Sequence, residues 1–448
     1  MQQQSIQPQE TTIAFFFLFL YTVCVLIRPH EIWVEYSDWI IIRVFAILCF
    51  LSILLTKRPI IVPYQTILFI IMLPLIMVSA FLNGEGSKGI GASQEIFIAL
   101  ILPLFMYANA ITTIKRQHLL MFVSIAASLI MIHNGYIQFE SDSGYGWAGY
   151  SHIVTGSDRG GTGRITYLGF FNDPNDLGML IVMNIPFVVY FYVKGNFFKK
   201  LLMIIIILIF AYGIELTGSR GTQLGAFSLI VVYFLVNSAG YRLFLFIVLL
   251  SPIVATVIAS FSGIASQDAS ADGRLEAWYY GINMMLANPV FGVGMDNFIG
   301  IHGRTAHNSY VLVAAELGVP GYSLWGGALI FTVLVSYLMI KSQKPVFDKK
   351  TRTYIPPKKV NEESKNELLL NKTLFFSLIG FMITGFFLSR TYTVVLFIYM
   401  GMTIASHLRL INLIPEYSIL MNKKMLFKSM LYSWVVIIAV YLSLKVGL

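Results

Sequence analysis

Residues 60–82 read IIVPYQTILFIIMLPLIMVSAFL and contain no charged side chain. A run of this length can cross a bilayer as one α-helix. Similar runs recur along the chain, because 57% of its 448 residues are hydrophobic and only 12% are charged. A soluble domain needs more charge than this on its exposed shell. We therefore predict an all-α, polytopic membrane protein in which residues 1–448 form a single integral membrane domain.

These apolar runs predict about 12–13 transmembrane helices. The count has a range because the final run could lie along the membrane surface instead of crossing it. The predicted spans are residues 12–27, 39–55, 60–82, 93–111, 118–138, 176–193, 201–216, 222–236, 243–260, 321–340, 373–388, 392–406 and 425–444.

Positive charges gather in the loops on one side of these spans. Lys57-Arg58 and Lys115-Arg116 lie in such loops, and residues 341–372 hold nine Lys or Arg. Basic loops of membrane proteins face the cytoplasm. We therefore expect a multi-pass protein of the bacterial inner membrane, with a cytoplasmic N-terminus and a basic cytoplasmic linker at 341–372. The net charge of +9 is explained in this way, so it does not indicate nucleic-acid binding.

Two long loops, residues 139–175 and 261–307, fall on the opposite, periplasmic side. Both mix glycine, aromatic residues, aspartate and single arginines. Loops of this length are usually functional or disordered, and their aromatic content argues against disorder. We therefore expect the active site to face the periplasm, with catalytic residues in the larger loop, 261–307.

Two arginines are candidates for binding an anion on that side. Arg220 lies in LTGSRG, residues 216–221, where glycine lets the backbone approach a ligand closely. An arginine at the mouth of a bundle needs water or an anionic partner, and the structural alternative is a snorkelling side chain in a tight turn. Arg274 lies in DGRLEAW, residues 272–278, which suits an amphipathic helix against the membrane. A surface ion pair with Asp or Glu is its structural alternative.

His307 precedes an apolar stretch, 308–317, that ends at GVPG, residues 318–321. The glycines and proline should break a helix, so we expect a short helix with His307 at or next to its N-cap. A positive helix end disfavours a protonated imidazole, and a general base must be neutral near pH 7. The alternatives are a capping or interface histidine, and His302, in a freer loop, competes for the catalytic role.

Other candidate substrate-binding residues surround these positions. Arg304 and Asn308 flank His307, at a helix end that attracts phosphate. Arg164 precedes the run FNDPND, residues 171–176, and is a candidate for binding phosphate. Within that run Asn175 or Asp176 should cap the next span, so capping and turn formation explain the run without a ligand.

Three acidic or basic residues lie in apolar surroundings. Glu316 lies one turn before the predicted helix break, and a buried acid is costly unless it has a partner. Glu316 could bond to an arginine of the site or to backbone freed by the break, and structural support is its alternative role. Arg43 and Glu95 lie in or at the edge of spans and could form internal ion pairs.

The combination of arginines, one neutral histidine and aromatic rings suits a particular chemistry. The sequence has no HExxH, no clustered Cys/His and no Walker loop, and we expect neither a metal nor a cofactor. A periplasmic reaction without ATP needs an activated substrate, such as a lipid pyrophosphate-linked sugar. Arginines can stabilise the departing pyrophosphate, and a base takes the proton of the attacking hydroxyl. The aromatic side chains available to stack on sugars are Tyr145, Trp147, Trp278 and Tyr279.

At this point the sequence resembles a known family. The order RLEAW at 274–278, NP at 288–289, GVG at 292–294, HNSY at 307–310 and ELG at 316–318 is similar to the core of the O-antigen ligase/polymerase (Wzy-C) superfamily. SRG at 219–221 and DPN at 173–175 also fit. RPHE at 28–31 resembles a branch described as probable O-glycosylation ligase, found with exopolysaccharide loci.

The resemblance implies a GT-C-like bundle and metal-independent transfer from a polyprenyl-pyrophosphate-linked glycan. It implies that Arg220 and Arg274 bind phosphate and that His307 is the base. The acceptor is open: another lipid-linked repeat for an exopolysaccharide or O-antigen polymerase, lipid A-core for a ligase, or a protein hydroxyl. We favour the polymerase. Membrane lipid and a chain-length regulator are further expected partners. A transporter of lipid-linked glycan and a non-catalytic scaffold are the alternatives from other classes.

Overall fold

The computed structural model describes residues 11–56, 59–155, 163–238, 269–344, 346–348, 353–355 and 360–447. Within these ranges the chain is a helical bundle, which confirms the predicted all-α class. Two small antiparallel strand pairs are added to it: β1 (Val154–Thr155) pairs with β2 (Gly163–Arg164), and β3 (Val346–Asp348) pairs with β4 (Thr353–Ile355).

The helices follow one another along the chain with short connections. They are α1 (Thr12–Leu26), η1 (Pro29–Glu31), η2 (Val34–Tyr36), α2 (Ile41–Thr56), α3 (Tyr64–Leu82), α4 (Gly86–Ile96), the π-helical turn η3 (Phe97–Ile101), α5 (Leu102–Ala110), α6 (Ile114–Glu140), η5 (Gly169–Phe171), α7 (Pro174–Lys194), α8 (Phe197–Leu216), α9 (Arg220–Ser238), α11 (Ala269–Ala287), α12 (Asn297–His302), α13 (Ser309–Ser342), α14 (Glu362–Gly385), α15 (Val394–Leu413), η6 (Pro415–Leu420) and α16 (Lys423–Gly447).

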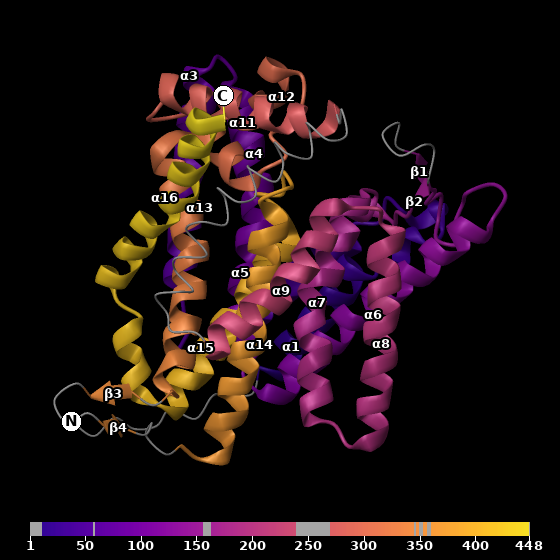
Figure 1. The fold of residues 1–448 in the computed structure, drawn as a ribbon, viewed down its shortest axis with the longest axis vertical. Helices are drawn as coiled ribbons and strands as arrows, with labels where there is room; N and C mark the ends of the chain where they lie inside the picture. Colours follow the sequence, from indigo (N-terminus) through magenta and orange to yellow (C-terminus); the bar gives the residue numbers. More distant parts are fainter. Residues whose placement is uncertain are drawn as a thin grey trace.

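The predicted spans agree with this element order. Every predicted span contains a helix except 243–260, which lies outside the described residues. Nine helices of the described part are long and apolar enough to cross a membrane. The last of them, α16, packs along α13 (Figure 1), where Tyr322 donates a hydrogen bond to the Ser433 carbonyl at 2.6 Å. The apolar runs therefore predicted the helices of a multi-pass membrane protein.

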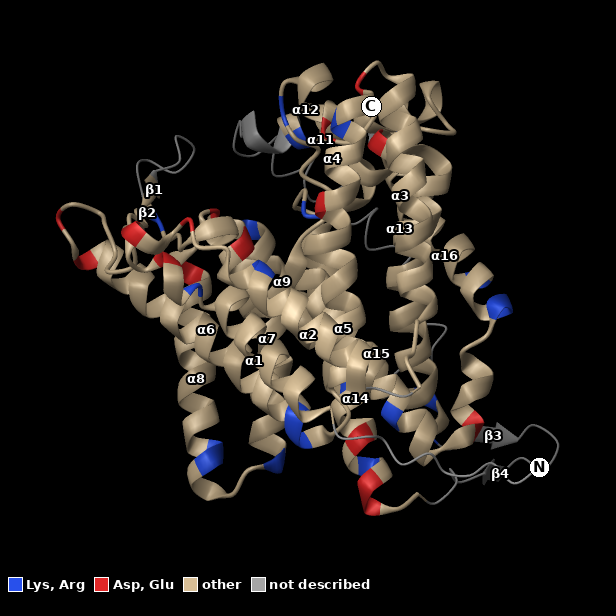
Figure 2. Cartoon of the chain, turned by 180° about the vertical axis from the view of Figure 1, so that it is seen from behind, with Lys and Arg blue, Asp and Glu red and all other residues tan. Residues whose placement is uncertain are grey.

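Charged residues gather toward the two ends of the helices, and the middle of the helices is largely uncharged (Figure 2). Polar side chains inside the bundle are paired across helices, as the absence of water requires. Tyr399 donates to Asn184 Oδ1 at 2.6 Å, and Asn184 donates to Ser128 at 2.8 Å. Near the other end, Arg409 and Glu367 form a buried ion pair at 2.9 Å.

The long loops gather at one end of the bundle. Elements β1, β2, α11 and α12 lie at the upper end in Figure 1, and β3 and β4 lie at the lower end. The loop predicted at 261–307 contains α11 and α12, which includes the helix expected around Arg274. The basic segment 341–372 contains the β3–β4 pair and the first turns of α14. The described parts of segments 261–307 and 341–372 therefore both contain regular secondary structure.

Candidate functional site

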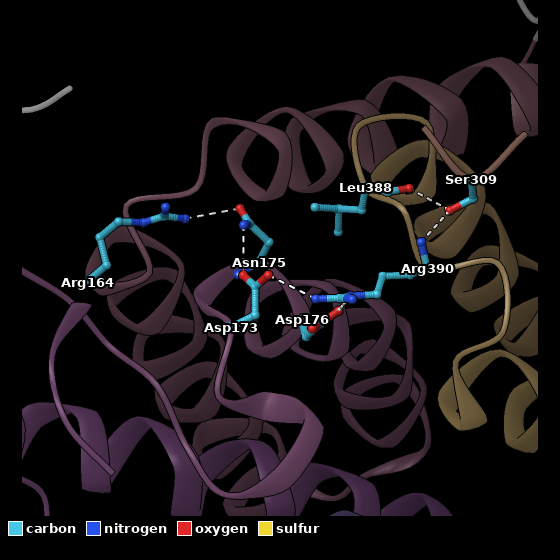
Figure 3. A network of polar contacts seen from close by, with 7 residues as sticks. All are labelled: Arg164, Asp173, Asn175, Asp176, Ser309, Leu388 and Arg390. Atoms are coloured by element: carbon cyan, nitrogen blue, oxygen red, sulfur yellow. Dashed lines mark hydrogen bonds and ion pairs between the residues drawn. The ribbon is translucent and has the colours of Figure 1, made fainter. Parts of the chain in front are cut away.

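A loop between α14 and α15 bonds to the first residues of α7 and α13 (Figure 3). Its Arg390 donates from Nη2 to Asp173 Oδ2 at 2.9 Å and from Nε to Asp176. Asp173 caps α7, because its Oδ1 accepts the backbone N–H of Asn175 at 2.8 Å. Asp176, in the first turn of α7, is buried. One arginine thus bonds to two carboxyl groups at the start of α7.

The same loop is fastened to the start of α13. Ser309 Oγ accepts the backbone N–H of Arg390 at 2.9 Å and donates to the Leu388 carbonyl at 2.6 Å. Thr391 donates to the Ser309 carbonyl at 2.8 Å. Since Ser309 is the first residue of α13, these bonds place Arg390 close to His307, two residues upstream.

His307 lies just before the N-cap of α13, as the sequence predicts. Asn308 is the cap, and its Oδ1 accepts the backbone N–H groups of Tyr310 at 2.9 Å and Val311 at 3.1 Å. His307 has a φ of 50°, a left-handed conformation that costs energy for a residue with a Cβ. The Asn308 Nδ2 is buried and has no hydrogen-bond partner among the described residues. A strained backbone and an unpartnered buried polar atom are both typical of ligand-binding sites.

The surroundings of the half-buried His307 favour a neutral imidazole. Burial lowers its pKa below the usual value of 6.5, and the positive charge of Arg274 lowers it further. Asp173 acts in the opposite direction. Arg304 and Arg390 add smaller effects that lower the pKa. The charged residues that act on His307 therefore come from segments that are far apart in the sequence.

Arg164 connects this cluster to the turn before α9. Its Nη2 donates to Asn175 Oδ1 at 3.0 Å, and its Nε donates to the Thr217 carbonyl at 2.8 Å. Asn175 in turn donates from Nδ2 to Asp173 at 2.8 Å. Arg164 therefore holds together two of the segments that the sequence singles out (Figure 3).

Arg220 is the first residue of α9 and is exposed. The preceding Gly218 has a φ of 54°, so this turn requires the glycine that the sequence provides. Beside it, a Cβ on Gly221 would lie 3.2 Å from Phe387, in the same loop as Arg390. The start of α9 therefore lies against the loop that carries Arg390.

The segment around Arg274 adds two positive charges. Arg274 is half-buried on α11, and the exposed Arg304 reaches back toward this helix. A Cβ on Gly273 would lie 3.0 Å from Arg304 Nη1. Trp278 is only 1% exposed and packs against Phe386 at 5.1 Å, so its ring is not open for sugar stacking in this structure. Exposed aromatic rings are provided instead by Tyr145, Trp147 and Tyr279.

Glu316 braces the helix break. It is buried, and its carboxylate accepts backbone N–H groups of Asp296 and Phe298, while its carbonyl accepts Gly294 N at 3.0 Å. The break itself is at Gly318, whose φ is 62°. These partners are backbone groups of residues 294–298, a segment that the sequence analysis did not consider as a partner of Glu316.

The glycines of the 288–294 segment explain why that motif has its composition. Gly292 lies against the backbone of Glu316, where a Cβ has no room. A Cβ on Gly318 would lie 2.6 Å from the Pro289 carbonyl, which accepts Val319 N at 2.7 Å. The loop and the broken helix therefore fit together only because both carry glycine. Their contact holds α13 in place on the C-terminal side of His307.

Arg390 is the residue that the sequence analysis missed. It lies in LSRT, residues 388–391, between two predicted spans on the same side as Arg220. The criterion that singled out Arg220, an arginine at the outer mouth of the bundle, applies equally to Arg390. Its partners Asp173 and Asp176 are more than two hundred positions away in the sequence, so no local motif connects them.

The described residues contain no group of three or more His, Cys, Asp and Glu placed to hold a metal ion. In comparisons with known proteins, residues 202–326 match the family model described as O-antigen ligase. No curated protein matches the chain. The match includes Arg220, Arg274 and His307, and it leaves Arg164 and Arg390 outside. The protein is therefore a multi-pass membrane protein in which residues 202–326 match the O-antigen ligase family domain, and members of that family are enzymes that transfer lipid-linked glycans.

Proposed function

We propose that this protein transfers a glycan from a polyprenyl-pyrophosphate carrier to an acceptor hydroxyl, on the periplasmic face of a bacterial inner membrane, without a metal. The observation that carries the proposal is the convergence on His307 of Arg274, Arg304 and Arg390, whose charges all lower its pKa. A neutral base and several guanidinium groups in one place are what this transfer needs.

In the proposed reaction, His307 accepts the proton of the acceptor hydroxyl as the oxygen attacks the anomeric carbon of the donor sugar. A new C–O bond forms, and the bond from that carbon to the pyrophosphate oxygen breaks. The leaving polyprenyl pyrophosphate takes the electron pair. Arg220 and Arg274 are the proposed partners for this anion, and guanidinium groups bind phosphate in a bidentate manner.

The remaining candidates have supporting roles in this proposal. Arg164 and Arg390 are positioning residues, because they bond to Asn175, Asp173 and Asp176 and so hold the ends of α7, α9 and α13 together. Arg304 and Asn308 flank the base and are proposed to contact substrate. Trp278 and Glu316 were predicted to bind substrate, and their buried positions favour support of the site.

Among acceptors we favour another lipid-linked repeat, which makes the protein a polymerase of exopolysaccharide or O-antigen. A ligase to lipid A-core or a protein hydroxyl is the alternative within the same chemistry. The positive-inside rule places the basic segment 341–372 in the cytoplasm. Elements β3, β4 and the start of α14 belong to this segment and lie at the end opposite α11 and α12, which supports a periplasmic site.

Glycan sizes in cells test the proposal. In a strain that lacks the gene, we expect lipid-linked and surface glycans, resolved by size, to lose their long chains and to retain single repeats, and the wild-type gene should restore long chains. Long chains that remain on the carrier lipid would instead identify a ligase. Unchanged glycans in the deletion strain would contradict glycan transfer altogether.

The activity should persist below the pH at which an ordinary histidine becomes protonated. A base must be neutral. Burial of His307 and the positive charge of Arg274 both lower the pKa of His307 from 6.5. Activity is therefore full above this lowered pKa and is lost as the pH falls through it. Arg304→Gln removes one positive charge, so the acid limb of kcat/KM should move to higher pH.

This pH profile is measured on purified protein with a lipid pyrophosphate-linked donor. Lys88→Gln is the matched control, because Lys88 is a positive residue on the outer end of α4, where it pairs with Glu85, and it does not act on His307. An acid limb that stays at the same pH in Arg304→Gln would contradict the assignment of His307 as the base.

A further inference from the structure

A cavity of about 790 Å³ lies between η1, α2 and α4. We call it the α2–α4 cavity. It is bounded by Arg28, His30, Glu31, Arg43, Glu95 and Phe170, among others. Pockets of this size hold ligands with several rings, and none of the predicted catalytic residues lines it.

Two of its lining residues are charges on helices of the bundle. Arg43 lies on α2, and Glu95 lies on α4 about 13 Å along the helix from Gly86, at 1.5 Å per residue. The sequence left open that they form internal ion pairs, and the part of the chain that the structure describes shows no ion pair for either. Both line the cavity. Arg43 is the third residue of α2, and both side chains are exposed, so their charged groups are accessible to a ligand in the cavity.

His30 supplies a second, independent observation. Its side chain is more than nine-tenths buried and lines the cavity. Its Nδ1 has no hydrogen-bond partner among the described residues, and its Nε2 lies 3.5 Å from Glu31. Buried polar atoms of native proteins are nearly always bonded to protein or water. The cavity wall therefore holds a buried polar atom whose hydrogen bond the described residues do not supply.

The cavity adjoins the candidate site. Phe170 lines it three residues before Asp173, and Val394 lines it four residues after Arg390. Arg28 lies over the Phe170 ring at 5.5 Å from its centroid and donates to Glu31 at 2.6 Å. The segment before α7, which also carries Asp173, therefore forms part of the cavity wall.

The charge balance of the lining indicates the class of ligand. Two arginines, Arg28 and Arg43, face three carboxylates, Asp38, Glu31 and Glu95, which gives a formal charge of −1. Such a balance does not favour pyrophosphate. It offers donors and acceptors for hydroxyl groups, and the aromatic rings of Trp39 and Phe170 offer apolar faces.

We propose that the α2–α4 cavity binds the oligosaccharide portion of a lipid-linked substrate and holds it beside the Arg390 loop. This inference rests on the proposed function. Helix α9 packs against α7 and α14, whereas α2 packs against α1 and α5. The cavity and the turn carrying Arg220 are therefore built on different helices, although each lies next to the α14–α15 segment. That separation favours the acceptor as the source of the oligosaccharide.

Binding is tested without catalysis on the full chain in lipid nanodiscs. The probe is the delipidated oligosaccharide released by mild acid from the lipid-linked glycans of the native strain, followed by saturation-transfer NMR and calorimetry. We expect wild type to bind it, and Glu95→Gln and Arg43→Gln to bind it at least about tenfold more weakly. Trp39→Ala should also weaken binding, and this exposed residue does not support the core.

The matched controls are Glu85→Gln and Lys88→Gln, an exposed pair at the outer end of α4 that does not line the cavity. They should bind the probe as wild type does, as should His307→Ala, and inorganic pyrophosphate should not displace the probe. With purified enzyme, Glu95→Gln should raise the KM for the acceptor; a rise only for the donor would assign the oligosaccharide to the donor.

Wild-type affinity in Glu95→Gln, Arg43→Gln and Trp39→Ala would overturn the proposal, as would a wild-type protein that does not bind the oligosaccharide. A different result would separate the two proposals. If binding depends on these residues but deletion of the gene leaves all glycans unchanged, the cavity binds oligosaccharide and the protein is not a glycan transferase.

Discussion

His307→Ala is expected to lower the rate of glycan transfer about 10²–10⁴-fold, the usual contribution of a general base. The imidazole lies before the N-cap of α13 among Arg274, Arg304 and Arg390, and its lowered pKa keeps it neutral. Alanine removes the proton acceptor and leaves the cap, because Asn308 makes the capping bonds. The variant should therefore fold, insert in the membrane and retain donor binding while its kcat falls.

His302→Ala is the matched control for this loss. His302 ends α12, where its ring packs near Tyr280 and Phe298 and its Nδ1 lies 3.3 Å from the Arg304 carbonyl. It was the competing candidate for the base. Single-turnover rates of both variants, with equal amounts of folded protein, separate the two histidines. A normal rate in His307→Ala with a large loss in His302→Ala would transfer the role to His302.

Hydropathy predicted the bundle because a membrane span must satisfy its own backbone within one apolar helix, so length and composition alone identify it. The break at Gly318 was predicted for a similarly local reason, since glycine and proline act on their own turn of helix. The position of His307 beside the cap followed from that break. These features depend on neighbours in sequence, and a single sequence contains that information.

The partners of the site residues could not be predicted in the same way. Arg390 reaches Asp173 and Asp176 only after α7, α14 and α15 pack together. Trp278 follows Arg274 by four residues, yet its ring turns inward against Phe386. Side-chain direction on a helix is set by what the helix packs against, and that requires the fold. The α2–α4 cavity likewise appears only when α2 and α4 are placed together.

Arg390→Ala is expected to destabilise the protein by about 3 kcal/mol and to reduce transfer strongly. Arg390 is 37% exposed, but Asp176 is only 2% exposed, so removing the arginine leaves an uncompensated charge on a buried carboxyl group. The loop that fastens Ser309 also loses the anchoring side chain beside it. Loss of this positive charge, with Asp173 left unpaired, raises the pKa of His307, so the remaining activity should have its acid limb at higher pH.

Arg409→Ala is the matched control, because Arg409 pairs with the buried Glu367 near the opposite end of α15. It should lower thermal stability similarly and leave the activity per folded protein and its pH profile unchanged. A variant with both Arg390→Ala and Asp176→Asn removes the unpaired carboxylate and should recover thermal stability.

The double variant decides what Arg390 does. Arg390→Lys keeps a positive charge but cannot bond to two carboxylates as a guanidinium does. If Arg390 serves only the fold, activity returns with stability in the Arg390→Ala/Asp176→Asn variant. If the Arg390 side chain holds its loop beside His307 through Asp173 and Asp176 and lowers the pKa of His307, then stability returns while kcat stays low and the acid limb stays shifted. Full activity in the stabilised double variant would limit Arg390 to a structural role and leave Arg220 and Arg274 as the proposed phosphate-binding arginines.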